Sequence, residues 1–136
     1  MIAGGGNPTG GSFTGPSQSL ELTGDFAYSY SGQVDLDSTT KTLSQFTTGN
    51  YLFVGQFQMI FDKTQFNTGE SIGYTIDING VTIARLELEA AATTTEALQQ
   101  PLDLIIPPYT TVHVQGDTDA GGIIVTGLMT GRIYRG

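Results

Sequence analysis

The sequence predicts an all-β protein, an antiparallel β-sandwich of about eight strands with a flexible N-terminal arm. Three observations support this prediction. Apolar and polar residues alternate with period 2 in most segments, as in strands that bury one face. The expected strands recur at spacings typical of sandwiches and small barrels. Asn79-Gly80 separates two alternating runs, which is the strongest short-range signal for a β-hairpin.

The composition excludes several classes of protein. The 136 residues fit one domain that can bury a core without disulfides, and the chain has no cysteine. Its 13 acidic residues outnumber five scattered basic ones, which gives a net charge of −8. We therefore expect no binding to nucleic acid or to an anionic membrane surface. No apolar run approaches the roughly 18 residues that a membrane-spanning helix requires.

Residues 1–19 form the predicted arm, and residues 20–136 form the single sandwich domain. The arm is rich in Gly, Pro and Ser, and it buries too little apolar surface to offset its ordering entropy. It is either a disordered tail or leader, or an arm that orders only against a neighbouring molecule, with Ile2 and Phe13 as anchors. We expect no secretory leader, because this segment lacks a cationic start and an apolar core.

The first predicted strands cover residues 25–37 and 40–50, the second of which is short and polar. Residues 25–37 alternate, and their apolar side chains share one parity on both sides of Ser31-Gly32. These side chains are Phe26, Tyr28, Tyr30, Val34 and Leu36.

Residues 50–61 (NYLFVGQFQMIF) form a predicted strand that is apolar on both faces. One face can fill a core. It carries Tyr51, Phe53, Phe57, Met59 and Phe61. The opposite face carries Leu52, Val54 and Ile60, and it needs a partner of its own.

Residues 70–89 are expected to form a hairpin with a type I′ turn at Asn79-Gly80. Beyond the turn, Leu86 has the wrong parity to join the core. A β-bulge near Ala84 and Arg85 would correct this, because one extra residue reverses the side-chain phase. The expected pairs before the bulge are Ile78 with Val81 and Ile76 with Ile83.

The remaining segments complete the sandwich. Residues 90–100 are expected to form a loop with at most one helical turn. Residues 101–117 have strand character on either side of Pro107-Pro108, which belongs at a strand end because proline donates no ladder hydrogen bond. Residues 121–136 form the last strand. Its in-phase apolar residues are Ile123, Val125, Met129 and Ile133.

The segment order resembles a known family. SQFTTGNYLFVGQFQMIF, a strand pair turning at INGV, PLDLIIPPYTTVHVQ and TGLMTGRIY follow one another as in the compact trimeric jelly rolls of the complement globular-head and tumour necrosis factor type. The chain is most similar to the decoration or cement proteins that trimerise on the outside of tailed-phage capsids. The resemblance covers roughly residues 24–135. The missing secretory leader and collagen-like stalk favour the viral members.

This resemblance implies partners for the chain. It implies a homotrimer in which Leu52, Val54 and Ile60 form the subunit interface, although a long loop or the arm could instead cover them within one subunit. It also implies a capsid-exterior location, where the arm would contact the major capsid protein lattice through Ile2 and Phe13.

Few residues suggest catalysis. His113 lies on the parity opposite its apolar neighbours, which indicates a surface or interface position, and no nucleophile motif accompanies it. The segment DTDAGG, residues 117–122, is similar to a calcium loop but lacks its third ligand and its distant glutamate. We therefore predict no enzymatic activity, no cofactor and no metal. The acidic i, i+2 pairs considered are Asp35 with Asp37, Glu87 with Glu89, and Asp117 with Asp119.

Two other functions stay open. One is a recognition module, such as the receptor- or carbohydrate-binding head of a phage fibre or a lectin-like domain. Exposed Tyr51, Tyr109 and Tyr134 would be its binding residues. The other is a small hydrolase, for which the sequence offers no specific feature.

Overall fold

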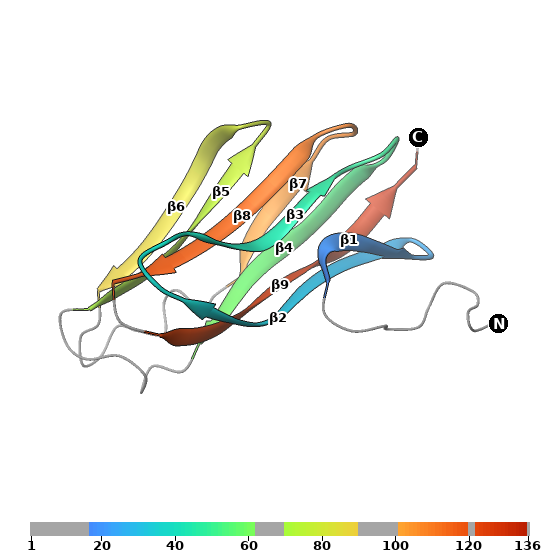
Figure 1. The fold of residues 1–136 in the computed structure, drawn as a ribbon. Coiled ribbons are helices and arrows are strands. Elements are labelled where there is room, and N and C mark those ends of the chain that lie inside the picture. The colour runs from blue at the N-terminus through green and yellow to red at the C-terminus, as the bar shows by residue number, and fades with distance from the viewer. Residues whose placement is uncertain (1–16, 62–69, 90–100, 120–121, 136) are drawn as a thin grey trace.

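The computed structural model describes residues 17–61, 70–89, 101–119 and 122–135, and every regular element within these ranges is a β-strand. The strands form two antiparallel sheets packed face to face, in the orders β1-β2-β9-β4-β7 and β3-β8-β5-β6 (Figure 1). This confirms the predicted β-sandwich. Within the described residues, no helix is long and apolar enough to span a membrane. The strands are β1 (Ser17–Thr23), β2 (Phe26–Leu36), β3 (Lys41–Thr47), β4 (Leu52–Phe61), β5 (Ser71–Ile78), β6 (Val81–Glu89), β7 (Leu102–Ile106), β8 (Thr111–Thr118) and β9 (Ile123–Tyr134).

The strand pairs are nested about the turn at Asn79-Gly80. β5 pairs with β6, β4 with β7, β3 with β8 and β2 with β9, as in a jelly roll made by wrapping one long hairpin into two layers. Asn79 and Gly80 have φ angles of 50° and 80°, so both residues are left-handed as a type I′ turn requires. Ile78 lies opposite Val81, which confirms that expected pair. Strand β1 begins at Ser17, inside the segment assigned to the arm.

The hairpin contains the predicted β-bulge one residue earlier than expected. Ile76 pairs with Ala84 rather than with Ile83, and Ile83 is the extra residue. Ile83 therefore leaves the core and is 53% exposed. The bulge reverses the side-chain phase, which brings Leu86 against the core.

A second bulge divides the apolar residues of β2 between the two faces of its sheet. Ser31 and Gly32 together face Gly127 of β9, and the Ser31 hydroxyl accepts a 2.8 Å hydrogen bond from the Gly127 N–H. The phase reverses there, so Leu36 is buried in the core whereas Phe26 points outward. The sequence expectation that these residues share one face is therefore wrong. The reason is the extra residue of the bulge at Ser31-Gly32, which reverses the side-chain phase of the strand beyond it.

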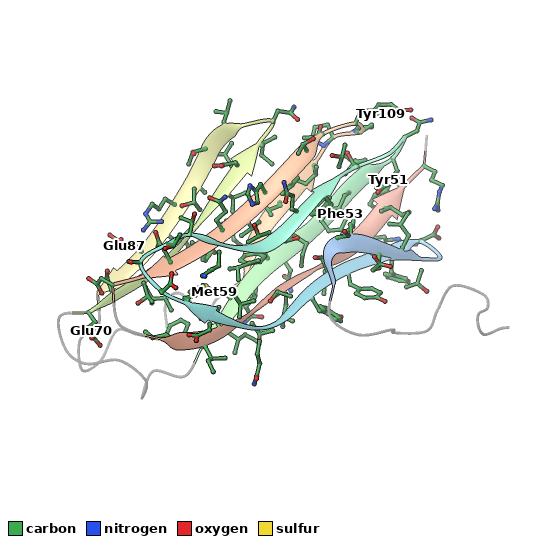
Figure 2. All side chains as sticks on the ribbon, viewed as in Figure 1. Tyr51, Phe53, Met59, Glu70, Glu87 and Tyr109 are labelled. Atoms are coloured by element: carbon green, nitrogen blue, oxygen red, sulfur yellow. The ribbon has the colours of Figure 1, made fainter. Side chains whose placement is uncertain are left out.

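Strand β4 sends its larger side chains into the core as predicted, with Phe53 and Met59 fully buried (Figure 2). Gly55 lies opposite Gly131 of β9 in the ladder. A Cβ atom on Gly131 would meet the carbonyl oxygen of Val54, would lie 2.5 Å from the Gly55 Cα and would lie 2.9 Å from the Phe53 ring. Both strands therefore require glycine here, because backbone approaches backbone.

We predict that Gly131→Ala lowers the free energy of unfolding by about 2–3 kcal/mol, because the added methyl group overpacks against backbone that cannot move aside. Chemical denaturation measures this loss. Gly49→Ala is the matched control and should cost much less, because its Cβ would meet only the Tyr51 side chain, at 3.1 Å. Equal midpoints for wild type and Gly131→Ala would contradict the close approach of the two strands.

Tyr74 places a polar atom in the middle of the core. The side chain is fully buried on β5, and its ring centroid lies 5.0 Å from that of Phe57. The hydroxyl makes no hydrogen bond with any residue in the described ranges. Burial raises the pKa of Tyr74 above its ordinary value of 10.0, because the phenolate is poorly solvated there.

We predict that Tyr74→Phe raises the free energy of unfolding by about 1 kcal/mol, because it removes a buried group without a hydrogen-bond partner. In the wild type, the unfolded chain loses the Tyr74 proton more readily than the folded chain, so stability falls as pH rises through and above 10.0. Tyr74→Phe should reduce this alkaline loss in denaturation curves recorded across pH. Tyr109→Phe, at an exposed ring, should change neither quantity.

Candidate assembly surface

The outward side chains of β2, β4, β7 and β9 form one continuous surface on the five-stranded sheet, named the apolar face. Large apolar residues lie open there: Ile105 is 70% exposed and Phe26 is 56% exposed. Such residues are usually buried, and a contiguous patch of them marks an interaction site. The face comprises Phe26, Tyr28, Tyr30, Gln33, Asp35, Leu52, Val54, Gln56, Gln58, Ile60, Asp103, Ile105, Ile124, Thr126, Leu128, Thr130, Arg132 and Tyr134.

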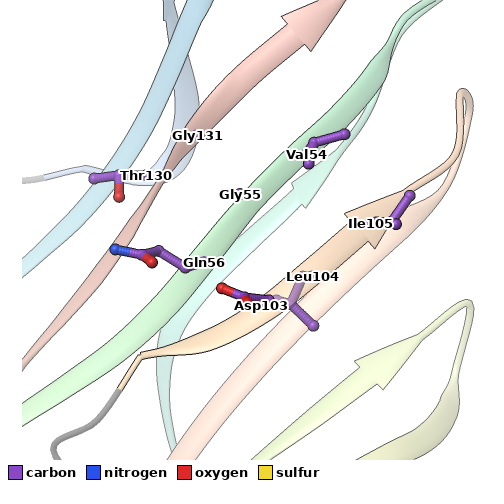
Figure 3. Close-up of a pocket in the computed structure, with 8 residues that line it drawn as sticks. All are labelled: Val54, Gly55, Gln56, Asp103, Leu104, Ile105, Thr130 and Gly131. Carbon is purple, nitrogen blue, oxygen red and sulfur yellow. The ribbon is translucent and has the colours of Figure 1, made fainter.

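Val54 lies at the centre of this face. In the ladder it is opposite Ile105 on β7 and opposite Arg132 on β9, and Arg132 is opposite Phe26 on β2. A shallow hollow of about 610 Å³ lies on the β7 side of Val54 (Figure 3). A second hollow of about 520 Å³ lies on the β2 side, and Val54, Thr130 and Gly131 line both. The face therefore has concave regions that another surface can fill.

The outward face of the four-stranded sheet is chemically different and is named the polar face. Its side chains bind one another: Thr47 and Thr111 hydroxyls lie 2.9 Å apart, and Arg85 donates to Asp117 at 3.1 Å. His113 lies on this face, as predicted for a surface position, with its Nε2 atom 2.9 Å from the Thr42 hydroxyl. The sandwich thus has one face suited to water and one that is not. The other members of the polar face are Gln45, Thr75, Asp77, Thr82 and Gln115.

The three predicted interface residues lie together on the apolar face. Leu52 and Val54 are half-buried, and Ile60 is 41% exposed. Their strand buries its opposite face in the core, so the two-sided apolar pattern of residues 50–61 is real. Coverage of these side chains by a second copy stays a prediction. The alternative covering segments fall partly on residues 1–16, 62–69 and 90–100, outside the described ranges.

The other candidate residues are dispersed. Ile2 and Phe13 lie outside the described residues. Tyr109 is 69% exposed in the turn between β7 and β8 with a φ of 55°, and Tyr51 is partly buried against the core at the same end of the sandwich (Figure 2). Tyr134 belongs to the apolar face. The three tyrosines therefore come from different surfaces.

Three of the paired acidic residues make local contacts at the opposite end of the molecule, whereas Asp35 is exposed on the apolar face. Asp117 pairs with Arg85 at 3.1 Å, and Arg85 also binds Glu87 at 2.9 Å. The Asp119 carboxylate accepts a 2.6 Å hydrogen bond from the Ser71 N–H. In the part of the chain that the structure describes, no group of three acidic, His or Cys side chains is placed to hold a metal ion.

Sequence reasoning missed most of the apolar face. Phe26, Ile105 and Ile124 are exposed members of this face that were not among the predicted interface residues. The run LIIPP offered one signal, because adjacent Ile105 and Ile106 cannot both point into the core from one strand. The bulge in β2 gave no such signal.

No protein-family model matches the chain, and no curated protein matches its sequence. Its function is therefore inferred from the chemistry of its surfaces.

Proposed function

We propose that this protein is a structural subunit without enzymatic activity, which assembles through its apolar face into a homotrimer that decorates the exterior of a viral capsid. The apolar face is the observation that carries this proposal. Exposed Ile105 and Phe26 flank the central Val54 on a sheet whose other side is already a packed core. A second protein surface is what removes such a face from water.

The size of the face agrees with a stable interface. The four strands of the face, spaced about 4.8 Å apart and about nine residues long on average, span roughly 19 by 30 Å, or about 600 Å². This is comparable to the about 800 Å² per partner that a standard protein interface buries. At about 25 cal/mol per Å² of apolar surface, even a partly apolar contact of this size offers enough gross free energy for association.

A copy of the same chain is the partner that the proposal favours. Most oligomers are built from identical subunits with closed symmetry, and the face contains both hollows and protruding side chains such as Ile105. The threefold copy number and the capsid setting rest on the resemblance to trimeric jelly rolls and to phage decoration proteins. The net charge of −8 per chain supports an exterior position away from nucleic acid.

The assembly proposal predicts that Val54→Asp converts the oligomer to monomers at micromolar concentration. Each interface would bury a carboxylate without a partner, at a cost of several kcal/mol. Light scattering should give about three times the 14.4 kDa chain mass for the wild type and the single mass for the variant.

Gln45→Asp is the matched control for that experiment, because it adds the same charge to the exposed polar face. It should leave the oligomer intact. A wild-type chain that is monomeric at micromolar concentration would refute the assembly proposal.

The capsid proposal predicts that deleting residues 1–16 leaves a folded trimer with at least about tenfold weaker binding to undecorated capsids. When one arm of a trimer has docked, the effective concentration of the other two arms near the capsid is raised, so the three arms bind together. Deleting all three arms removes this contribution to affinity. The deletion ends before Ser17 because β1 pairs there with Tyr30 of β2. Co-sedimentation with capsids measures the binding. If the deletion did not weaken binding, the arm would not be the attachment site, and the turns around Tyr109 would be the next candidate.

A further inference from the structure

One charged residue of the apolar face, Asp35, lies at the far end of β2 from Val54. Near Val54 the face carries two others, Asp103 and Arg132. They have opposite signs. Both lie within the apolar face, where any self-association of that face would take them out of water together with Val54 and Ile105.

The Asp103 carboxylate lies open on the apolar face. It is exposed on β7 and lines the 610 Å³ hollow with Gln56 and Val54 (Figure 3). No hydrogen bond or ion pair joins it to a residue in the described ranges. The hollow therefore has an apolar floor and one negative charge at its margin.

Arg132 is held by two aromatic rings and by a shared carboxylate. Its guanidinium lies 5.3 Å from the centre of the Phe26 ring and 5.9 Å from that of Tyr134, so the two rings hold it in place. Its ion pair with Asp25 is long, at 3.9 Å, and Asp25 is shared with Arg135 at 3.7 Å. Among the described residues, one carboxylate therefore serves both guanidinium groups, and neither of the two ion pairs is short.

The two groups do not meet in this chain. Arg132 is opposite Val54, whereas Asp103 is opposite Gln56, so the two residues are separated by β4 and by two residues along the strands. The Arg132 guanidinium lies instead over the Phe26 ring of β2, on the side away from Asp103. This orientation leaves the Asp103 carboxylate open to the guanidinium of a second copy.

We propose that Arg132 of one protomer binds Asp103 of its neighbour when the apolar faces associate. This inference rests on the proposed self-association and names the polar contact that sets its register. A buried charge without a partner opposes association, and near Val54 the face supplies one acid, Asp103, and one base, Arg132, that would cancel. A guanidinium already oriented by two aromatic rings suits a two-point contact with a carboxylate.

Charge reversal tests the pair. Asp103→Arg and Arg132→Asp should each weaken self-association at least tenfold in sedimentation equilibrium, because each places two like charges together. The double variant Asp103→Arg/Arg132→Asp should restore the dissociation constant to within about threefold of the wild type. Asp77→Arg, on the polar face of the other sheet, is the matched control and should have little effect.

A second experiment uses the absence of cysteine from the chain. Mixed Asp103→Cys and Arg132→Cys chains should be joined by a bis-maleimide whose spacer is about as long as an arginine side chain, because an arginine–carboxylate pair holds the two backbones further apart than the about 7 Å that a disulfide bridges. Denaturing gels would show covalent oligomers. Each variant treated alone is the control and should give few. This readout also remains available if a charge-reversal variant folds poorly.

The outcomes separate the two proposals. A wild-type oligomer whose double charge reversal is as weak as the single variants, and whose two cysteine variants do not cross-link to each other, overturns the Arg132–Asp103 pair and leaves self-association standing. A monomeric wild type overturns self-association, and the pair with it. Restored assembly together with cross-linking supports both.

Discussion

The fold depends on antiparallel pairing nested about a single tight turn, Asn79-Gly80. Each strand from β2 to β9 pairs with the strand that lies equally far from the turn on its other side, and successive pairs alternate between the two sheets. The left-handed conformation of both turn residues sets the register of the innermost pair. Because register decides which side chains point inward, this pairing decides what the core contains and what the two outer faces present.

The difference between the two outer faces is the main functional feature of the sandwich. Two packed sheets share one core, so each has one face that the other does not cover. On the four-stranded sheet that face carries hydroxyls and ion pairs such as Arg85 with Asp117, which bind one another and water. On the five-stranded sheet it carries Phe26 and Ile105. Both faces belong to one molecule, so their different chemistry indicates that each face is suited to different surroundings.

The close contact of Gly55 with Gly131 links the core to the apolar face. From inside, the Phe53 ring lies over both glycines, and on the outside the same two residues line the larger hollow. A side chain at either position would disturb packing within the subunit as well as the shape of the face. The residues that stabilise the sandwich and those that shape its apolar face therefore overlap at this point.

The sequence by itself determined the strand content, the Asn79-Gly80 hairpin, the existence of a bulge near Ala84 and the two-sided apolar character of residues 50–61. These are local properties of alternation and turn chemistry. Only the tertiary structure decided that Phe26 and Leu36 point to opposite faces, and that strands distant in sequence place Ile105, Val54 and Arg132 in one row. The physical reason is that a bulge shifts the phase of a whole strand by one residue, and that neighbours across a sheet are set by long-range register, which no local pattern records.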